Sequence, residues 1–213
     1  YVDVFDRWSE LTGITFVYEA NDDGADQSSG NSGVLGVRGD IRIGGHDIDG
    51  NSGVLAYNYF PDFGEMVIDT NDTFYNTTGG NSIRLRNVLA HEVGHGIGIR
   101  HVESNNGDFL MEPFLNTSFD GPQFDDILGA QRHYGDANEG NDSAGTATSL
   151  GPISVGETIT IGADAGGTAV STSEVDFVSI DDNSDVDYFS FDVAAGIEIS
   201  VTLTPVGPTY NQG

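Results

Sequence analysis

The apolar residues at the start of the chain recur every three or four positions, which predicts an amphipathic helix over residues 2–12. One stripe of this helix contains Val2, Phe5, Trp8 and Leu11. The period then changes to two, and Thr15–Glu19 is predicted to be a strand. Residues 21–36 are rich in Gly, Ser, Asn and Asp, which predicts a loop.

Three more strands and two more helices are predicted before residue 135. The strands are Asp40–Ile43, Val54–Phe60 and Glu65–Asp69. Asn81–Ser82 can cap a helix that ends near Gly96, and a last helix over Gln123–Tyr134 ends at Gly135.

The pattern changes after residue 138, where only short β-type runs separated by Gly, Asp, Asn and Pro remain. The sequence therefore predicts an α+β domain over 1–138, a polar linker over 139–144 and an incomplete all-β sandwich module over 145–213. The chain opens directly in a helix, so we expect further parts of a longer polypeptide at both ends.

The composition is strongly acidic, with a formal net charge of −27 and only seven basic residues, all arginine. Such a surface disfavours nucleic acid and anionic lipid as partners. No apolar run is long enough for a membrane span. The acidic residues form either a solvated coat suited to a salty exterior or, in loops, ligands for calcium. Without cysteine, disulfides and thiol chemistry are excluded.

One segment carries recognisable chemistry, the run HEVGHGIGIRH at residues 91–101. On a helix His91 and His95 lie one turn apart and point to the same side, so both imidazoles can bind one ion. Gly98 permits a turn that returns His101 as a third ligand. The alternative, three ordinary surface histidines, does not explain why they cluster with a glutamate at this spacing.

Three neutral imidazoles leave a fourth position open, which is typical of a catalytic zinc site. Zinc acidifies its bound water, and Glu92 is placed to accept the proton and pass it to a leaving amine. The motif thus predicts a zinc-dependent endopeptidase with His91, His95 and His101 as ligands and Glu92 as catalytic base.

This motif resembles the metzincins, in which a methionine-containing turn lies beneath the metal. Met111, in FLMEPF, stands where that turn is expected, although it could also be an ordinary core residue. Within the metzincins, residues 2–135 resemble the matrixins, or matrix-metalloproteinase-like proteases. The segments that carry the resemblance are VFDRWSELTGITF, GDIRI, DGNSGVLAYNYFP, LMEP and FDDILGAQRHYG.

The resemblance implies a mixed twisted sheet with an active-site helix and a closing helix, whose Asp125 and Asp126 are structural. It also implies that the first strand precedes Tyr1. A second, structural zinc is not expected, because Tyr57 and Val67 occupy positions where the family carries ligands.

Calcium positions are also implied by the resemblance, with solvated turn aspartates as the alternative. The first set is Asp49, Gly50, Ser52, Val54, Asp69 and Asp72, and a second set is Asp40 with Glu65. Oxygen ligands of this kind suit Ca²⁺.

By the same resemblance, an extended protein substrate pairs with the edge strand that includes Val54, Leu55, Ala56 and Tyr57. Phe114 is expected to line a specificity pocket or, alternatively, to belong to the core.

The tail resembles a truncated bacterial pre-peptidase C-terminal domain, through NDSAGTATSL, SDVDYFSFDVAAG and ISVTLTPVGPTY. These likenesses imply a secreted or cell-surface bacterial enzyme. Two other functions stay open: a surface or assembly protein that uses a metalloprotease fold structurally, and a calcium-dependent adhesive module.

Overall fold

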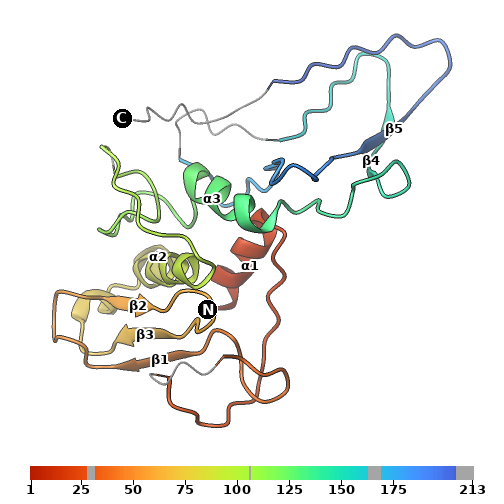
Figure 1. The fold of residues 1–213 in the computed structure, drawn as a ribbon. Helices are drawn as coiled ribbons and strands as arrows, with labels where there is room; N and C mark the ends of the chain where they lie inside the picture. Colours follow the sequence, from red (N-terminus) through yellow and green to blue (C-terminus); the bar gives the residue numbers. More distant parts are fainter. Residues whose placement is uncertain (28–31, 106, 163–168, 205–213) are drawn as a thin grey trace.

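A computed structural model gives the structure of the protein and describes residues 1–27, 32–105, 107–162 and 169–204 (Figure 1). In chain order its elements are α1 (Val2–Leu11), β1 (Ile43–His46), β2 (Ala56–Asn58), β3 (Met66–Asp69), the 3-10 turn η2 (Thr73–Asn76), α2 (Gly79–Gly96), α3 (Phe124–Tyr134), β4 (Thr148–Ile153) and β5 (Phe189–Val193). Among the described residues, no helix is long and apolar enough to span a bilayer.

Helix α1 forms as its apolar spacing predicts, and it buries Val4, Trp8 and Leu11. Val2 was expected on this stripe but is 66% exposed, because the stripe drifts around a 3.6-residue helix and Val4 takes its place. The helix ends at Thr12, whose hydroxyl donates to the Trp8 carbonyl at 2.8 Å and whose backbone is extended.

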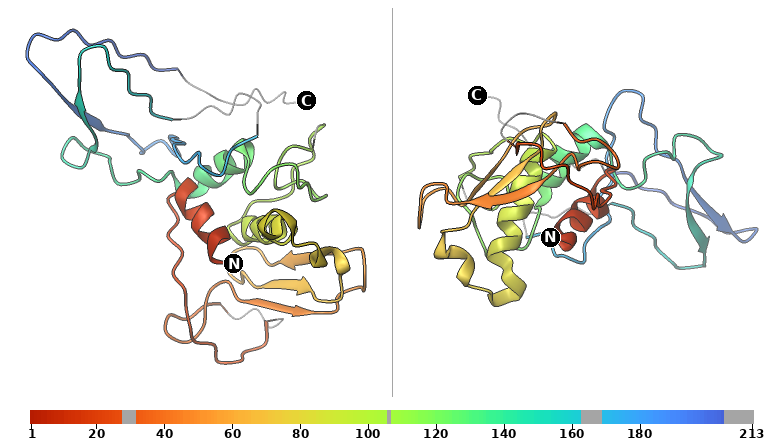
Figure 2. Two further views of the ribbon diagram at one scale, coloured as in Figure 1. Left: turned by 180° about the vertical axis from the view of Figure 1, so that it is seen from behind. Right: turned by 90° about the horizontal axis from the view of Figure 1, so that it is seen from below.

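A three-stranded sheet in the order β1-β3-β2 lies under α2 (Figures 1 and 2). β1 pairs in parallel with β3, placing Ile43 opposite Met66, and β2 pairs antiparallel with β3, placing Ala56 opposite Ile68. All four residues of β3 are buried, as expected for a central strand. β2 is therefore an edge strand of the described sheet.

Three of the predicted strands differ from the observed ones, and one of them, Val54–Phe60, is reduced to the three residues of β2, Ala56–Asn58. Thr15–Glu19 forms no strand, and none of the described strands pairs with it. The predicted strand at Asp40–Ile43 lies about three residues too early. The observed strand β1 contains Gly44 and Gly45, which show no alternation of apolar and polar side chains.

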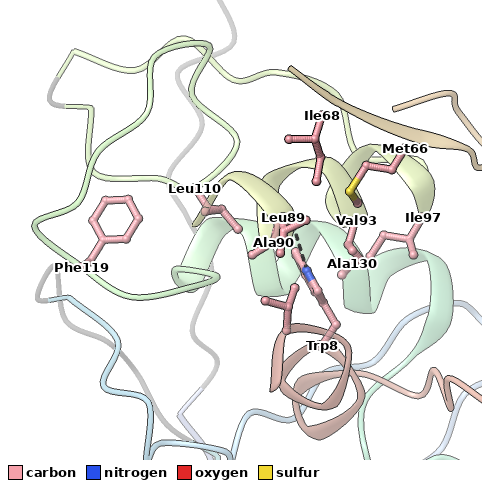
Figure 3. Packing of buried hydrophobic residues seen from close by; sticks show 11 residues of the cluster. Trp8, Met66, Ile68, Leu89, Ala90, Val93, Ile97, Leu110, Phe119 and Ala130 are labelled. Carbon is pink, nitrogen blue, oxygen red and sulfur yellow. Dashed lines mark hydrogen bonds between the residues drawn. The ribbon is translucent and has the colours of Figure 1, made fainter. Parts of the chain in front are cut away.

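The core is centred on α2, which packs between the sheet on one side and α1 and α3 on the other (Figures 1 and 3). From α2 it receives Leu89, Ala90, Val93 and Ile97, and Figure 3 shows Met66 and Ile68 of β3 across from them. Trp8 is fully buried, and its indole N–H donates to the Ala90 carbonyl at 3.1 Å. This bond fixes α1 against the middle of α2.

The start of α2 is irregular, which corrects the predicted cap. Gly80, Asn81 and Ser82 have positive φ values of 60°, 54° and 58°. Asn81–Ser82 therefore form a left-handed turn, and the regular helix begins after them. Asparagine tolerates this conformation better than most residues do, so the same residue type that favours a cap also favours this turn.

Helix α3 begins with a reciprocal capping box between Gln123 and Asp126. It ends at Gly135, whose φ of +67° lies in the left-handed region that glycine adopts without strain. Both ends agree with the sequence prediction.

In the C-terminal part, only β4 and β5 pair among the described residues, in parallel. The predicted sandwich is thus not confirmed. Residues 205–213 and 163–168, parts of the predicted β module, lie outside the described residues. Val170 and Phe177 pack with Leu11 and Ile127, so this segment contributes to a second small core with α1 and α3.

Trp8→Ala is expected to lower the free energy of unfolding by about 3–5 kcal/mol, because it removes a fully buried indole from the centre of the core. Val2→Ala, an exposed position on the same helix, should change it by less than about 0.5 kcal/mol. Urea unfolding followed by circular dichroism measures both. Equal effects of the two substitutions would contradict the packing of α1.

Candidate metal centre

Three histidines converge at the C-terminal end of α2. The Nε2 atoms of His91, His95 and His101 lie 3.1 Å from one another in all three pairs. Three nitrogen ligands on a tetrahedral zinc ion, each bonded at about 2.0–2.1 Å, would lie about 3.3–3.4 Å apart. The triangle therefore has the size that one metal ion requires, and the histidines are a group that could hold one.

The backbone after α2 brings the third histidine back. The Ile97 N–H still donates to the Val93 carbonyl, and then Gly98 adopts a φ of +98°. A residue with a side chain would be strained there. This turn reverses the chain so that His101, from the following segment, meets the two helical histidines.

Each helical histidine is oriented through its second ring nitrogen. His91 Nδ1 lies 2.7 Å from the Leu110 carbonyl oxygen, and His95 Nδ1 lies 2.8 Å from the Ile99 carbonyl oxygen. A carbonyl only accepts, so Nδ1 carries the proton and Nε2 presents its lone pair to the centre of the triangle.

Burial keeps these rings neutral. The pKa of His91 falls to about 4, mainly because burial penalises the charged ring, and the pKa of His95 is lowered for the same reason. A metal must displace any proton from its ligand. At neutral pH the two helical imidazoles therefore need no deprotonation before they bind a cation.

Glu92 follows His91 on the helix and is only 6% exposed. Burial raises its pKa to about 8, and no described residue offers its Oε2 atom a hydrogen bond. A buried carboxyl group without a partner is costly in a purely structural role. Its chemistry fits a group that exchanges a proton with a molecule bound beside the histidines.

Met111 lies beneath α2 and is 1% exposed. A Cβ atom added to Gly94 would lie only 2.4 Å from Met111 Sδ, so the turn approaches the helix at a position where only glycine fits. The expected methionine turn is therefore packed directly under the residues between His91 and His95. This position also makes Met111 a buried residue.

Asp126 at the start of α3 fixes this turn. Its carboxylate accepts from the backbone N–H groups of Leu110 and Met111 at 2.8 and 3.0 Å, and from Gln123 at 2.8 Å. Burial raises the pKa of Asp126 to about 6 in spite of these bonds. Because Leu110 supplies the carbonyl that orients His91, Asp126 supports the position of His91 through the turn.

The residues of the first expected calcium set surround one loop, residues 49–54. Asp69 Oδ2 accepts from the Asp49 N–H at 3.3 Å, and Asp72 Oδ2 accepts from the Ser52 N–H at 3.1 Å. Asp49 Oδ2 accepts from the Val54 N–H at 3.1 Å. Gly50 lies within this loop with a φ of +92°. In this arrangement the carboxylates satisfy backbone donors, and calcium binding here stays a prediction.

The second expected calcium pair has a different environment. Glu65 is fully buried, and its Oε1 accepts from Arg42 Nη2 at 2.7 Å, whereas Asp40 is exposed. Among the described residues, neither calcium set appears in a group of three or more histidine, aspartate or glutamate side chains that converge on one point. The Arg42–Glu65 ion pair neutralises the charge that a cation would otherwise balance.

The residues expected to bind substrate lie on and beside β2. Ala56 and Tyr57 belong to this edge strand, while Val54 and Leu55 precede it. Phe114 is 86% exposed, which excludes the core alternative for this residue.

Some supporting residues were not found from the sequence. Asn87 is fully buried on α2, donates to the Asn116 and Phe119 carbonyls and accepts from the Gly121 N–H, so it holds the loop that follows the methionine turn. The sequence did offer one indication of this role, because Asn87 lies four residues before His91 and hence on the same face of the helix. The roles of the Leu110 and Ile99 carbonyls could not be found from the sequence, because every residue has a backbone carbonyl group.

Comparison with known proteins identifies the relatives of this chain. A sequence model of the Matrixin family matches residues 2–135. Karilysin from Tannerella forsythia is 32% identical over 116 residues, covering 52% of this chain and 22% of karilysin. Metalloendoproteinase 4-MMP from Arabidopsis thaliana is 29% identical over 145 residues, covering 62% of this chain and 38% of the relative. Macrophage metalloelastase from Rattus norvegicus is 32% identical over 108 residues, covering 48% and 22%. The chain thus spans well under half the length of these relatives.

Asp126→Asn is expected to lower the free energy of unfolding by about 1–3 kcal/mol, because an amide nitrogen would face backbone donors that the carboxylate now satisfies. It should also weaken metal binding through Leu110 and His91. Asp125→Asn removes the same charge from the same helix end and is the matched control. Metal titration and urea unfolding measure both effects, and equal behaviour of the two variants would contradict this role.

Glu92→Gln is expected to stabilise the metal-free protein at about pH 8 but not at about pH 4.5. The wild-type carboxyl group has a folded pKa of about 8 against 4.5 in the unfolded chain. Between these values the folded state keeps a proton that the unfolded state has released, so wild-type stability falls as the pH rises. Glutamine does not titrate, so the variant escapes this loss. The difference in unfolding free energy between variant and wild type should reach a few kcal/mol at about pH 8, since each pKa unit corresponds to about 1.4 kcal/mol. Urea unfolding in EDTA measures it, and a difference that is constant with pH would argue against the raised pKa.

Proposed function

This chain belongs to the matrixin family of metalloproteases, and from that premise we propose that residues 1–138 form a zinc-dependent endopeptidase domain that cleaves extended protein substrates. The proposal rests above all on the triangle of three Nε2 atoms 3.1 Å apart. Donors of this type and spacing suit Zn²⁺ and leave one side of the ion free for substrate and solvent.

Zinc held by His91, His95 and His101 would supply a Lewis acid that polarises the scissile carbonyl and acidifies a neighbouring water molecule. The residues of the chain do the rest. Glu92 accepts the proton from the attacking water and delivers it to the nitrogen of the leaving amine.

Substrate is expected to bind along β2. The sheet order β1-β3-β2 leaves the outer side of this strand unpaired among the described residues, so its backbone groups can pair with an extended peptide. This mode recognises the backbone of the substrate and not its sequence. Phe114, exposed on the segment after Met111, offers an apolar contact for one substrate side chain.

The remaining features of the proposal concern the whole protein. We place the enzyme outside the cell or on the cell surface of a bacterium, with residues 139–144 as a linker. Residues 145–213 would act as an accessory module. The acidic composition with no cysteine is compatible with this setting and does not require it.

Glu92→Gln is expected to reduce kcat/KM for cleavage of unfolded protein by about 10²–10⁴-fold while one zinc ion stays bound, since it removes the proton acceptor but no ligand. His95→Ala should lose both zinc and cleavage. Glu10→Gln, an exposed position on α1, controls for the loss of charge.

Peptide cleavage assays with parallel zinc analysis decide between the candidate functions. An assembly protein that retains the fold structurally would bind zinc but cleave no substrate, in wild type and variants alike. Full activity in Glu92→Gln would show that another group moves the proton.

A further inference from the structure

Two arginines differ from most of the others in their surroundings. Arg84 of α2 and Arg100 form no ion pair among the described residues. Each lies over an aromatic ring instead. The guanidinium carbon of Arg84 is 4.6 Å from the centroid of the Phe74 ring, and that of Arg100 is 5.7 Å from the centroid of the Phe60 ring. In a chain with a net charge of −27, two cations without a carboxylate partner call for an explanation.

Arg84 lines a pocket at the start of the edge strand β2. The pocket has a volume of about 400 Å³, and Leu55, Thr73 and Phe74 also surround it. Tyr75 ties this region to the strand, because its hydroxyl donates to the Leu55 carbonyl at 2.7 Å. Arg84 Nη1 donates to the Phe74 carbonyl at 3.3 Å, and its other N–H groups make no hydrogen bond within the described part of the chain. The guanidinium is thus held in place while most of its five donors remain unused.

The acidic residue of this pocket does not neutralise Arg84. Asp72 also lines the pocket, but it is only 6% exposed. Its Oδ1 accepts from the Phe74 N–H at 2.7 Å, and its Oδ2 accepts from the Ser52 N–H at 3.1 Å. Both oxygens therefore bind backbone donors. The positive charge of Arg84 is left for an anion that enters the pocket.

Arg100 lies at the other end of β2. It is exposed and immediately precedes His101. Phe60, which lies under its guanidinium, follows the strand by two residues and is 44% exposed. The centroid of the Phe60 ring is 5.5 Å from that of His95. A single aromatic ring thus separates Arg100 from a predicted zinc ligand.

We propose that the endopeptidase selects acidic protein segments, with Asp or Glu side chains on both sides of the cleaved bond. This inference rests on the proposed function. Residues 55–60 span about 17 Å at about 3.3 Å per residue, so a peptide paired with β2 would pass both arginines. Carboxylates within about three residues of the cleaved bond would then lie near Arg84 on one side and near Arg100 on the other.

The two arginines suit carboxylates in particular. A guanidinium presents paired N–H groups that match the two oxygens of a carboxylate, and these charge-assisted hydrogen bonds are stronger than neutral ones. The rings of Phe74 and Phe60 support the flat faces of the two guanidinium groups. Their edges are left for the ligand, and less side-chain freedom is lost when it binds.

The overall charge of the chain predicts the opposite preference. A net charge of −27 attracts basic peptides and repels acidic ones at long range. Salt screens this field over about 8 Å at physiological ionic strength, whereas a hydrogen-bonded ion pair acts at contact. The composition and the two arginines therefore make predictions of opposite sign, and substrate preference decides between them.

Cleavage of matched peptides by the zinc-loaded full chain tests the inference. A neutral fluorogenic peptide is compared with versions that carry Glu before the cleaved bond, after it or on both sides, and with a version that carries Lys on both sides. Each acidic side is expected to raise kcat/KM about three- to tenfold, as for a partly exposed charge-assisted contact. Equal rates for neutral and acidic peptides, or fastest cleavage of the lysine peptide, would overturn the inference.

Single variants assign each preference to its arginine. Arg84→Gln should abolish the advantage of acidic peptides on one side of the cleaved bond only, and Arg100→Gln should abolish it on the other side only. Arg132→Gln is the matched control, since it removes the same charge from an exposed arginine of α3 that likewise forms no ion pair among the described residues. An equal loss of preference in this control would show an effect of net charge and contradict the two contacts.

Two further variants separate recognition from a structural role. Arg100→Glu should reverse the preference on its side, so that the lysine version is cleaved faster than the glutamate version, and an unreversed preference would contradict the inference. If Arg84→Gln does not fold, Ser52→Asp replaces it. Ser52 is exposed, lines the same pocket and has a φ of +73°, which aspartate tolerates. The added carboxylate should compete for Arg84 and abolish the acidic preference on that side, and an unchanged preference would contradict the role of Arg84.

Failure of this inference can be told apart from failure of the proposed function. If zinc-loaded wild type cleaves none of the peptides, the endopeptidase function is wrong. Binding of the same peptides to Glu92→Gln, measured by fluorescence anisotropy, still tests the groove. The doubly acidic peptide should bind at least about threefold more tightly than the neutral one, as a partly exposed charge-assisted contact predicts. Equal affinities would contradict the inference whatever the activity.

Discussion

The burial of α2 is the constraint on which the rest of the structure depends. This helix packs against the sheet on one side and against α1 and α3 on the other, so the helix that bears His91 and His95 is held by contacts on both sides. The Trp8 indole N–H donates a hydrogen bond to the carbonyl of Ala90, the residue immediately before His91, and so holds α2 next to its first histidine. Three imidazoles can meet within 3.1 Å only if the helix that bears two of them is fixed.

A second set of contacts, made by backbone groups, orients the imidazole rings on this fixed helix. The Leu110 and Ile99 carbonyls set the tautomers of His91 and His95, and Asp126 holds the turn that carries Leu110. The centre is thus supported from α3, through the methionine turn, to α2. Loss of any of these hydrogen bonds would therefore change the orientation of an imidazole ring although the histidine itself is unaltered.

The site could be predicted from the sequence more completely than the fold around it. The histidine motif is a local one, because helix periodicity brings His91 and His95 together and a single turn at Gly98 returns His101 to them. The helices α1 and α3 were also predictable from apolar spacing and from Gly135. The left-handed turn before α2 was not, since Asn81 and Ser82 favour a cap and a turn alike.

Features that depend on contacts between distant segments left little trace in the sequence. The short strands β1 and β2 are decided by pairing with β3 and not by their own residues, and β4 had no alternating pattern. The pairing of Glu65 with Arg42, where a calcium ligand was expected, likewise depends on tertiary structure. So do the positions of Arg84 over Phe74 and of Arg100 over Phe60.

The X-ray absorption spectrum of the zinc-loaded protein tests the central claim most directly. Three imidazole nitrogens and one oxygen ligand, all at about 2.0–2.1 Å, are predicted for zinc at His91, His95 and His101. A spectrum showing fewer than three imidazoles, or a fourth protein ligand that closes the coordination sphere, would contradict the account.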